Sequence, residues 1–177
     1  DKVHFKRKED LKYKKVLFVL ESPHHNEFDY EDDFKSQRPL MGNFDIFKVN
    51  FPKLMQEITQ NDSLAYEVTI YIPVPFQNSL HYLFRRNIKE QTKFGLWLYG
   101  WWDLKFHKEF EEFLGYKKFD YYINSSTRTY RTIISQKLSK LISTEYQVYN
   151  PNSSYWKRDD VKFGLKKIEK RAATNRA

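Results

Sequence analysis

The chain of 177 residues contains no cysteine. This absence excludes disulfide bonds, thiolate zinc sites and iron–sulfur clusters held by cysteine. It is typical of a reducing compartment, and we therefore expect a cytoplasmic protein. The chain also lacks an apolar run close to the roughly 18 residues that cross a bilayer, so the sequence predicts no membrane partner. The charged residues 1–8 lack the apolar core of a signal peptide.

Internal repeats, low-complexity tracts and Gly/Ser linkers are absent as well. The length suits one domain with enough residues to bury a core, and we expect that domain to cover residues 1–177. Within it, residues 1–14 are predicted to form an N-terminal arm or a helix. Residues 172–177 are expected to be a polar tail.

Acidic residues are outnumbered, because 31 Lys and Arg face 23 Asp and Glu and leave a net charge of +8. Aromatic residues make up 18% of the chain. Positive charge with many rings suits phosphate contacts and base stacking, so the composition favours nucleic acid as the partner. The alternative is a compositional bias with an aromatic core. A local acidic run stands apart from the positive excess: Asp29, Glu31, Asp32 and Asp33.

Four short β-prone segments alternate with helical patterns. Residues 16–20 are apolar throughout, which is typical of a central parallel strand buried on both faces. The other predicted strands are residues 68–72, 119–124 and 146–149. The predicted fold class is therefore α/β, with three α/β/α layers around a central, mainly parallel four-stranded sheet.

Helices are predicted between these strands, where apolar residues recur three and four positions apart. They cover residues 43–59, 80–87 and 103–114. A further helix is capped within residues 125–127 and has an apolar face that runs from Tyr130 to Ile142, and a last helix starts at Asp159 or Asp160. Pro52 predicts a kink or a restart in the first helix, and Asp103 is the expected cap of the third. In the last helix Val161, Leu165 and Ile168 are expected to face the core.

Ligands of parallel sheets bind beyond the carboxyl ends of the strands. Three segments are expected to converge there: residues 21–28, 73–79 and 150–156. Glu21 directly follows the strongest predicted strand. A carboxylate at that position can orient a water molecule or stabilise a developing cation. The alternative is a carboxylate that caps a helix or pairs with Arg38.

His24 is the second candidate catalytic residue, because histidine titrates near neutral pH. His24 and His25 are adjacent in a predicted loop, so only one of them is expected to face the site. A metal site could be drawn from four residues of this loop: Glu21, His24, Glu27 and Asp29. Their spacing matches no specific metal motif, so the sequence predicts no metal ion, and solvated loop charges are the simpler interpretation.

The candidate nucleic-acid-binding residues lie in loops at the same edge. Residues 38–43 place a proline and a glycine before a helix, whose backbone N–H groups can hold a phosphate or a base edge; the alternative is an ordinary turn. After the last strand, polar side chains can grip a phosphate while Tyr155 or Trp156 stacks or wedges into a duplex; the alternative is a polar turn with two core aromatics. The candidates are Ser22, Pro23, Arg38, Gly42, Asn43, Gln77, Asn78, Ser153, Ser154, Tyr155 and Trp156.

Three segments together resemble motifs of the uracil-DNA glycosylase superfamily, in the same order along residues 15–170. Residues 20–24, Leu-Glu-Ser-Pro-His, resemble the family's Gly-Glu-Ala-Pro-Gly or Gly-Gln-Asp-Pro-Tyr-His, and their Glu is closest to the Glu-containing branch. Residues 38–42, Arg-Pro-Leu-Met-Gly, are similar to its Pro-Phe-Val-Gly. Residues 149–153, Tyr-Asn-Pro-Asn-Ser, resemble its Asn-Pro-Ser with one residue inserted.

This resemblance implies a hydrolase of base excision and DNA repair, which cleaves the N-glycosidic bond of a flipped base. Glu21 would act on water or on the oxocarbenium ion. Asn150, Ser153 and Ser154 would contact the flipped nucleotide, with Asn150 completing the catalytic set. The family's chemistry needs no metal or organic cofactor.

The chain departs from the family at the residues that select uracil. Ile72 and Pro73 stand where the family has its base-reading Asn, and Leu40 stands where it has a ring that stacks on uracil. The cluster cysteines of some branches are absent. Three phenylalanines could replace the ring: Phe28, Phe44 and Phe76. A hydrogen-bonding site discriminates strongly, so loss of the reading Asn predicts altered or absent base specificity.

Three other functions stay open. The same fold can serve as a catalytically inactive nucleic-acid-binding module, which the missing Asn and ring favour. The loop at residues 21–33 could serve a metal-dependent nuclease, whose activity a chelator would remove. Trp97, Trp101 and Trp102 would mark a protein–protein contact if they are exposed, and part of the core if they are buried.

Overall fold

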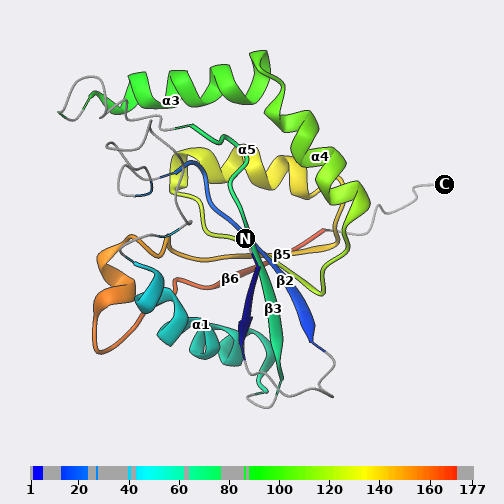
Figure 1. The fold of residues 1–177 in the computed structure, drawn as a ribbon, viewed down its shortest axis with the longest axis vertical. Helices are drawn as coiled ribbons and strands as arrows, with labels where there is room; N and C mark the ends of the chain where they lie inside the picture. The colour runs from blue at the N-terminus through cyan, green and yellow to red at the C-terminus, as the bar shows by residue number, and fades with distance from the viewer. Residues whose placement is uncertain are drawn as a thin grey trace.

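The fold is organised by a six-stranded sheet with the strand order β1-β3-β2-β4-β5-β6 (Figure 1). The computed structural model describes residues 2–5, 13–23, 27, 40, 43–61, 64–76, 86 and 88–170. The strands are β1 (Lys2–Phe5), β2 (Lys14–Val19), β3 (Tyr66–Tyr71), β4 (Tyr121–Asn124), β5 (Thr144–Gln147) and β6 (Lys166–Glu169). The four inner strands run parallel, and β1 and β6 pair antiparallel at the two edges.

Helices cover both faces of this sheet. They are α1 (Phe44–Thr59), α3 (Glu90–Leu98), the π-helix η2 (Tyr99–Asp103), α4 (Phe106–Tyr116), α5 (Arg128–Leu138) and the 3-10 helix η3 (Ser154–Lys157). Figure 1 shows α1 on one side of the sheet and α3, α4 and α5 on the other. The expected three-layer α/β/α architecture is therefore confirmed. In the described part of the chain, every helix is too short or too polar to cross a bilayer.

Strand β2 is the centre of the core, because side chains on both of its faces are fully buried. Val16 and Phe18 pack with α1, whereas Leu17 and Val19 pack with the layer that contains α3, α4 and α5. The ring of Phe18 meets Phe47 of α1 edge-on, with 5.0 Å between the centroids. A strand buried on both faces needs no alternation of polar residues, which explains its continuous apolar run.

The predicted four-stranded sheet is correct for the parallel centre but too small. Residues 2–5 form β1, an edge strand, where an arm or a helix was expected. The predicted last helix is wrong, because residues 166–169 form β6 against β5. Ile168 is 42% exposed and does not face the core. Pairing with the open edge of β5 satisfies backbone groups that a helix would have to satisfy internally, and this outweighs the helical spacing of the apolar residues.

The other predicted helices are largely confirmed. Helix α1 begins one residue after Asn43 and continues through Pro52. The predicted helix at residues 103–114 begins later, at Phe106, because Asp103 belongs to the π-helix η2 and Lys105 holds the cap position. The segment at residues 80–87 lies outside the described residues except for Arg86.

Gly164 is required by the turn that leads into β6. Its φ of +60° is unfavourable for other residues, and an added Cβ would lie 2.5 Å from the ring of Tyr149. We expect Gly164→Ala to lower the free energy of unfolding by about 1–3 kcal/mol. Gly95→Ala, at an open helical position of α3, is the matched control and should raise it by about 0.5–1 kcal/mol. Urea denaturation of both variants checks the opposite signs; equal effects would contradict the expectation.

Candidate active site

Glu21 lies just beyond the end of β2, and three elements fix it there. Its backbone carbonyl accepts a hydrogen bond of 2.8 Å from Trp97 Nε1 in α3. Its carboxylate Oε2 accepts one from the backbone N–H of Thr127 and one from Asn150 Nδ2, each 3.2 Å long. The structure therefore joins Glu21 and Asn150, two of the three predicted catalytic residues.

This position is the topological switch point of the sheet. Strands β2 and β4 are parallel neighbours. The helix that follows β2 in the sequence, α1, lies on one face of the sheet, and the helix that follows β4, α5, lies on the other (Figure 1). In open α/β sheets the crevice between two such strands is where ligands bind. Glu21 follows β2 and Thr127 precedes α5, so their hydrogen bond spans this point.

Burial sets the protonation behaviour of Glu21. It raises the pKa of the Glu21 carboxyl from its ordinary 4.5 to about 6, against hydrogen bonds from Thr127 and Asn150 that lower it. Thr127 is the N-cap residue of α5, where the helix dipole also favours a negative charge. A carboxyl that titrates near neutral pH can change protonation state during a reaction.

The two loops that hold Glu21 are braced to each other by α5. Arg131 donates from Nε to the carbonyl of Ser126 at 2.9 Å and from Nη2 to the carbonyl of Val148 at 2.7 Å. Ser125 Oγ donates to the carbonyl of Tyr149 at 2.9 Å. These bonds fix the loop after β4 against the loop after β5, and so place the Thr127 and Asn150 donors on the same carboxylate oxygen.

The loop after β5 is also tied to the start of α1. Asn150 Oδ1 accepts from the backbone N–H of Asn152 at 2.9 Å, which closes a tight turn. Asn152 Oδ1 in turn accepts from Asn43 Nδ2. The predicted candidate Asn43 is therefore a support of the site through Asn152.

The predicted serines differ in accessibility. Ser154 is exposed at the start of η3, and Ser22 is partly exposed beside Glu21. Ser153 Oγ is buried and has no hydrogen-bond partner among the described residues. A phosphate contact by Ser153 would therefore need its hydroxyl to turn outward, whereas Ser154 needs no such change.

An exposed stack of rings adjoins the Asn150 loop. Tyr149 and Tyr155 lie parallel, with 4.6 Å between centroids, and each is more than a third exposed. The guanidinium of Arg158 lies 5.0 Å from the Tyr155 ring centre. Rings and a guanidinium at the surface are groups that can stack on bases and contact phosphates, and the role of Tyr155 stays a prediction.

Trp156 is a correction to the predicted nucleic-acid surface. It is fully buried and stacks on Phe47 of α1, and its Nε1 donates to the carbonyl of Tyr149. A buried ring cannot stack on a base, so the core interpretation applies. Pro23 is also buried. Leu40, at the place of the family's stacking ring, is fully buried as well.

The tryptophan cluster divides between core and surface. Trp97 and Trp101 are buried in the layer of α3 to α5, so for them the core alternative is correct. Trp102 is exposed. Of the possible replacement rings, Phe44 and Phe76 are partly buried.

Glu27 of the considered metal set has a structural partner. Its carboxylate accepts a hydrogen bond of 3.0 Å from the buried backbone N–H of Leu40. Within the described ranges, no group of three His, Asp or Glu side chains is arranged to hold a metal ion. The other two loop members of that set lie outside the described residues. So do five predicted site residues: His24, Arg38, Gly42, Gln77 and Asn78.

Sequence reasoning missed two residues that support Glu21. Thr127 donates its backbone N–H to the Glu21 carboxylate, and Arg131 bonds to carbonyls of the two loops that hold Glu21. Residues 125–127 follow the third predicted strand and were interpreted as helix caps. The rule that ligands bind beyond the carboxyl ends of parallel strands places this loop at the same edge as Glu21. That rule is the signal that could have found residues 125–127.

Comparison of the chain with protein-family models, with curated proteins and with solved structures finds no match.

The raised pKa of Glu21 has a consequence for stability. The folded state holds the Glu21 proton more tightly than the unfolded state does, so stability is lost as pH rises from 4.5 through about 6. Glu21→Gln removes this titration and keeps an oxygen that accepts both hydrogen bonds. We expect the variant to exceed the parent in free energy of unfolding by up to about 2 kcal/mol above pH 7, and by nothing below pH 4.5.

Glu111→Gln is the control for this stability measurement. Lys137 hydrogen-bonds the Glu111 carboxylate and holds its pKa below the ordinary value. Loss of the Glu111 carboxylate should therefore leave the free energy of unfolding equal or lower at neutral pH. Urea denaturation between pH 4 and 8 compares the variants. A Glu21→Gln variant less stable than the parent above pH 7 would contradict the account of Glu21 burial.

Asn150 is expected to hold the pKa of Glu21 down. Asn150→Ala removes a donor to the carboxylate, so the pKa of Glu21 should rise above about 6. Asn150→Asp keeps the acceptor for the Asn152 amide but adds a second carboxyl, so the pKa should rise further. A carbon-detected NMR titration of the side-chain carboxyls measures both shifts, with Glu111 as an internal reference that stays constant. An unchanged Glu21 titration in both variants would refute the assigned contact.

Proposed function

We propose that this protein is a uracil-DNA glycosylase-like hydrolase, which excises a flipped base from DNA with a base specificity altered from uracil. The observation that carries the proposal is the Glu21 carboxylate at the switch point, hydrogen-bonded by Thr127 and Asn150 and titrating near pH 6. The motif resemblance implies that Glu21 is the acting carboxylate and that Asn150 contacts the flipped nucleotide. Two independent lines of reasoning thus select one pair of residues.

The chemistry follows from a carboxylate beside an electron-deficient sugar. As the bond between the sugar C1′ and the base nitrogen breaks, the electron pair leaves with the base and positive charge develops on the sugar. Ionised Glu21 stabilises that charge and orients a water molecule, whose oxygen bonds to C1′. The water proton is released and the base nitrogen is protonated. No step requires a metal or an organic cofactor.

Substrate contact is assigned to the surface next to this carboxylate. Ser154 and Arg158 can approach a phosphate, and Tyr155 offers an exposed ring for a base or a wedge. Ile72 and the buried Pro73 supply no side-chain amide at the place of the family's reading Asn. This absence supports a base other than uracil.

The second candidate is a catalytically inactive nucleic-acid-binding module on the same fold. Two observations favour it: Glu21 Oε2 already accepts two hydrogen bonds, and Leu40 is buried where the family has a stacking ring. It predicts the same surface contacts but no bond cleavage.

The test is incubation with labelled single- and double-stranded oligonucleotides that carry uracil, hypoxanthine, xanthine or normal bases, followed by alkali. We expect alkali-dependent breaks at one base, reduced by about a hundredfold or more in Glu21→Gln. Because the reaction needs ionised Glu21, the rate should fall as pH drops below about 6. Glu111→Gln, a surface carboxyl distant in sequence from the site, should retain the parent's rate.

The other outcomes identify the alternatives. Breaks without alkali that EDTA suppresses would replace the proposal by the metal-dependent nuclease of the 21–33 loop. Salt-sensitive binding without cleavage would establish the inactive binder. The absence of both binding and cleavage would remove nucleic acid from the account.

A further inference from the structure

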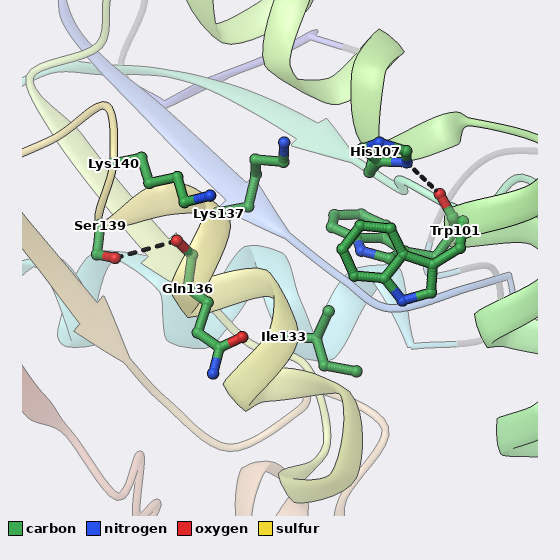
Figure 2. Close-up of a pocket in the computed structure, with 8 residues that line it drawn as sticks. Trp101, His107, Ile133, Gln136, Lys137, Ser139 and Lys140 are labelled. Atoms are coloured by element: carbon green, nitrogen blue, oxygen red, sulfur yellow. Dashed lines mark hydrogen bonds between the residues drawn. The ribbon is translucent and has the colours of Figure 1, made fainter.

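A cavity lies between η2, α4 and α5, away from Glu21 (Figure 2). Its volume of about 420 Å³ is within the range of small-molecule sites. The residues that matter to its chemistry are Trp101, Trp102, His107, Gln136, Lys137 and Lys140. Gln136 lies nine positions after Thr127, about 14 Å along α5. The cavity therefore belongs to the other end of α5.

The lining that the structure describes contains one unsatisfied hydrogen-bond donor. Trp101 Nε1 is buried and has no acceptor among the described residues. His107 Nδ1 lies 2.5 Å from the carbonyl of Trp101, and since a carbonyl only accepts, that nitrogen donates within the protein and is not free for a ligand. Gln136 on α5 adds a side-chain amide, which can donate and accept. A ligand that fits must supply acceptors.

The cavity is also positively charged. Lys137 and Lys140 both line it. The carboxylate of Glu111 lies 2.6 Å from Lys137 Nζ and neutralises one positive charge. The side chain of Lys137 is only 12% exposed, so it is held in place rather than free in solvent. Two lysines and one glutamate leave one net positive charge at the cavity, which favours an anion.

Trp102 gives the cavity an exposed ring. It is 54% exposed, whereas the other three tryptophans are at most 1% exposed. The ring is held 4.8 Å from His107 and 6.4 Å from Trp101, measured between centroids. It is carried by the π-helix η2, and such irregular turns frequently mark functional sites. A fixed ring at the surface is a platform for a planar aromatic group.

We propose that this cavity binds a nucleotide, with the base stacked on Trp102 and the phosphate held by Lys137 and Lys140. Base ring atoms supply acceptors for the indole and amide donors, and the phosphate matches the lysines. The nucleotide is either free or a unit of a polynucleotide strand, because both present the same chemistry. This site shares no residue with the Glu21 site and does not depend on the proposed activity.

The probes are AMP, UMP, adenosine, inorganic phosphate and a single-stranded oligonucleotide with a 5′-phosphate, titrated at low and high salt. Tryptophan fluorescence reports the site, because Trp102 is the one exposed tryptophan of the four in the chain. We expect a mononucleotide to bind better than either adenosine or phosphate alone, and salt to weaken it. If the oligonucleotide alone saturates the site, its ligand is a strand unit; if the mononucleotides alone do so, it is a free nucleotide.

Substitutions of the ring and of the charged residues each predict a change of affinity in a stated direction. Trp102→Ala should lower nucleotide affinity about tenfold or more, and Trp102→Phe should restore part of it. Lys140→Gln should weaken binding, whereas Glu111→Gln should strengthen it by removing the neutralising carboxylate. Lys48→Gln, on the opposite helical layer, and Glu21→Gln should leave affinity unchanged. Binding that ignores Trp102→Ala, or that is absent for every probe, would overturn the proposal, and circular dichroism would show whether each variant is folded.

Discussion

The burial of β2 on both faces is the constraint on which the rest of the structure depends. Phe18 packs with α1, while Leu17 packs with the opposite layer, so the strand is fixed from two sides. Because β2 is held in this way, the residues that follow it lie at a fixed position at the carboxyl edge of the sheet. Glu21 therefore reaches the switch point with its position fixed by the core, and only its carboxylate is left for the loops to hold.

The surroundings of the Glu21 carboxylate disfavour its charged form. Burial raises its pKa even though Thr127 and Asn150 donate to it. A charged group in such a place lowers the stability of the fold, and structures keep this kind of strain mostly where it serves function. Arg131 adds a cationic brace between the two donor loops, although burial lowers its own pKa. The two loops around Glu21 are thus held by hydrogen bonds of Arg131 rather than by packing of apolar side chains.

The sequence predicts the parallel centre well, because residues 16–20 are unambiguous and polar residues follow each strand. It also selects Glu21 and Asn150, since both follow predicted strands and both match a motif. The prediction is wrong for Trp156, because an aromatic residue in a polar loop is compatible both with a wedge into a duplex and with a place in the core. Only its packing against Phe47 shows that it belongs to the core. The prediction is wrong at β6 for a related reason: four residues without alternation carry no strand signal, and the open edge of β5 determines their conformation.

Helix α5 links the two sites described above and limits how they can influence each other. The backbone N–H of its N-cap residue Thr127 donates to Glu21, while Lys137 in its last turn and Lys140 just beyond its end line the cavity. Coupling between two sites requires an element with two alternative arrangements. Ile134 and Leu138 of α5 are fully buried against the sheet, so the helix has one well-packed position. Ligand binding at one end is therefore expected to leave the other end in place, unless it breaks the two hydrogen bonds by which Arg131 spans both loops at the Glu21 site.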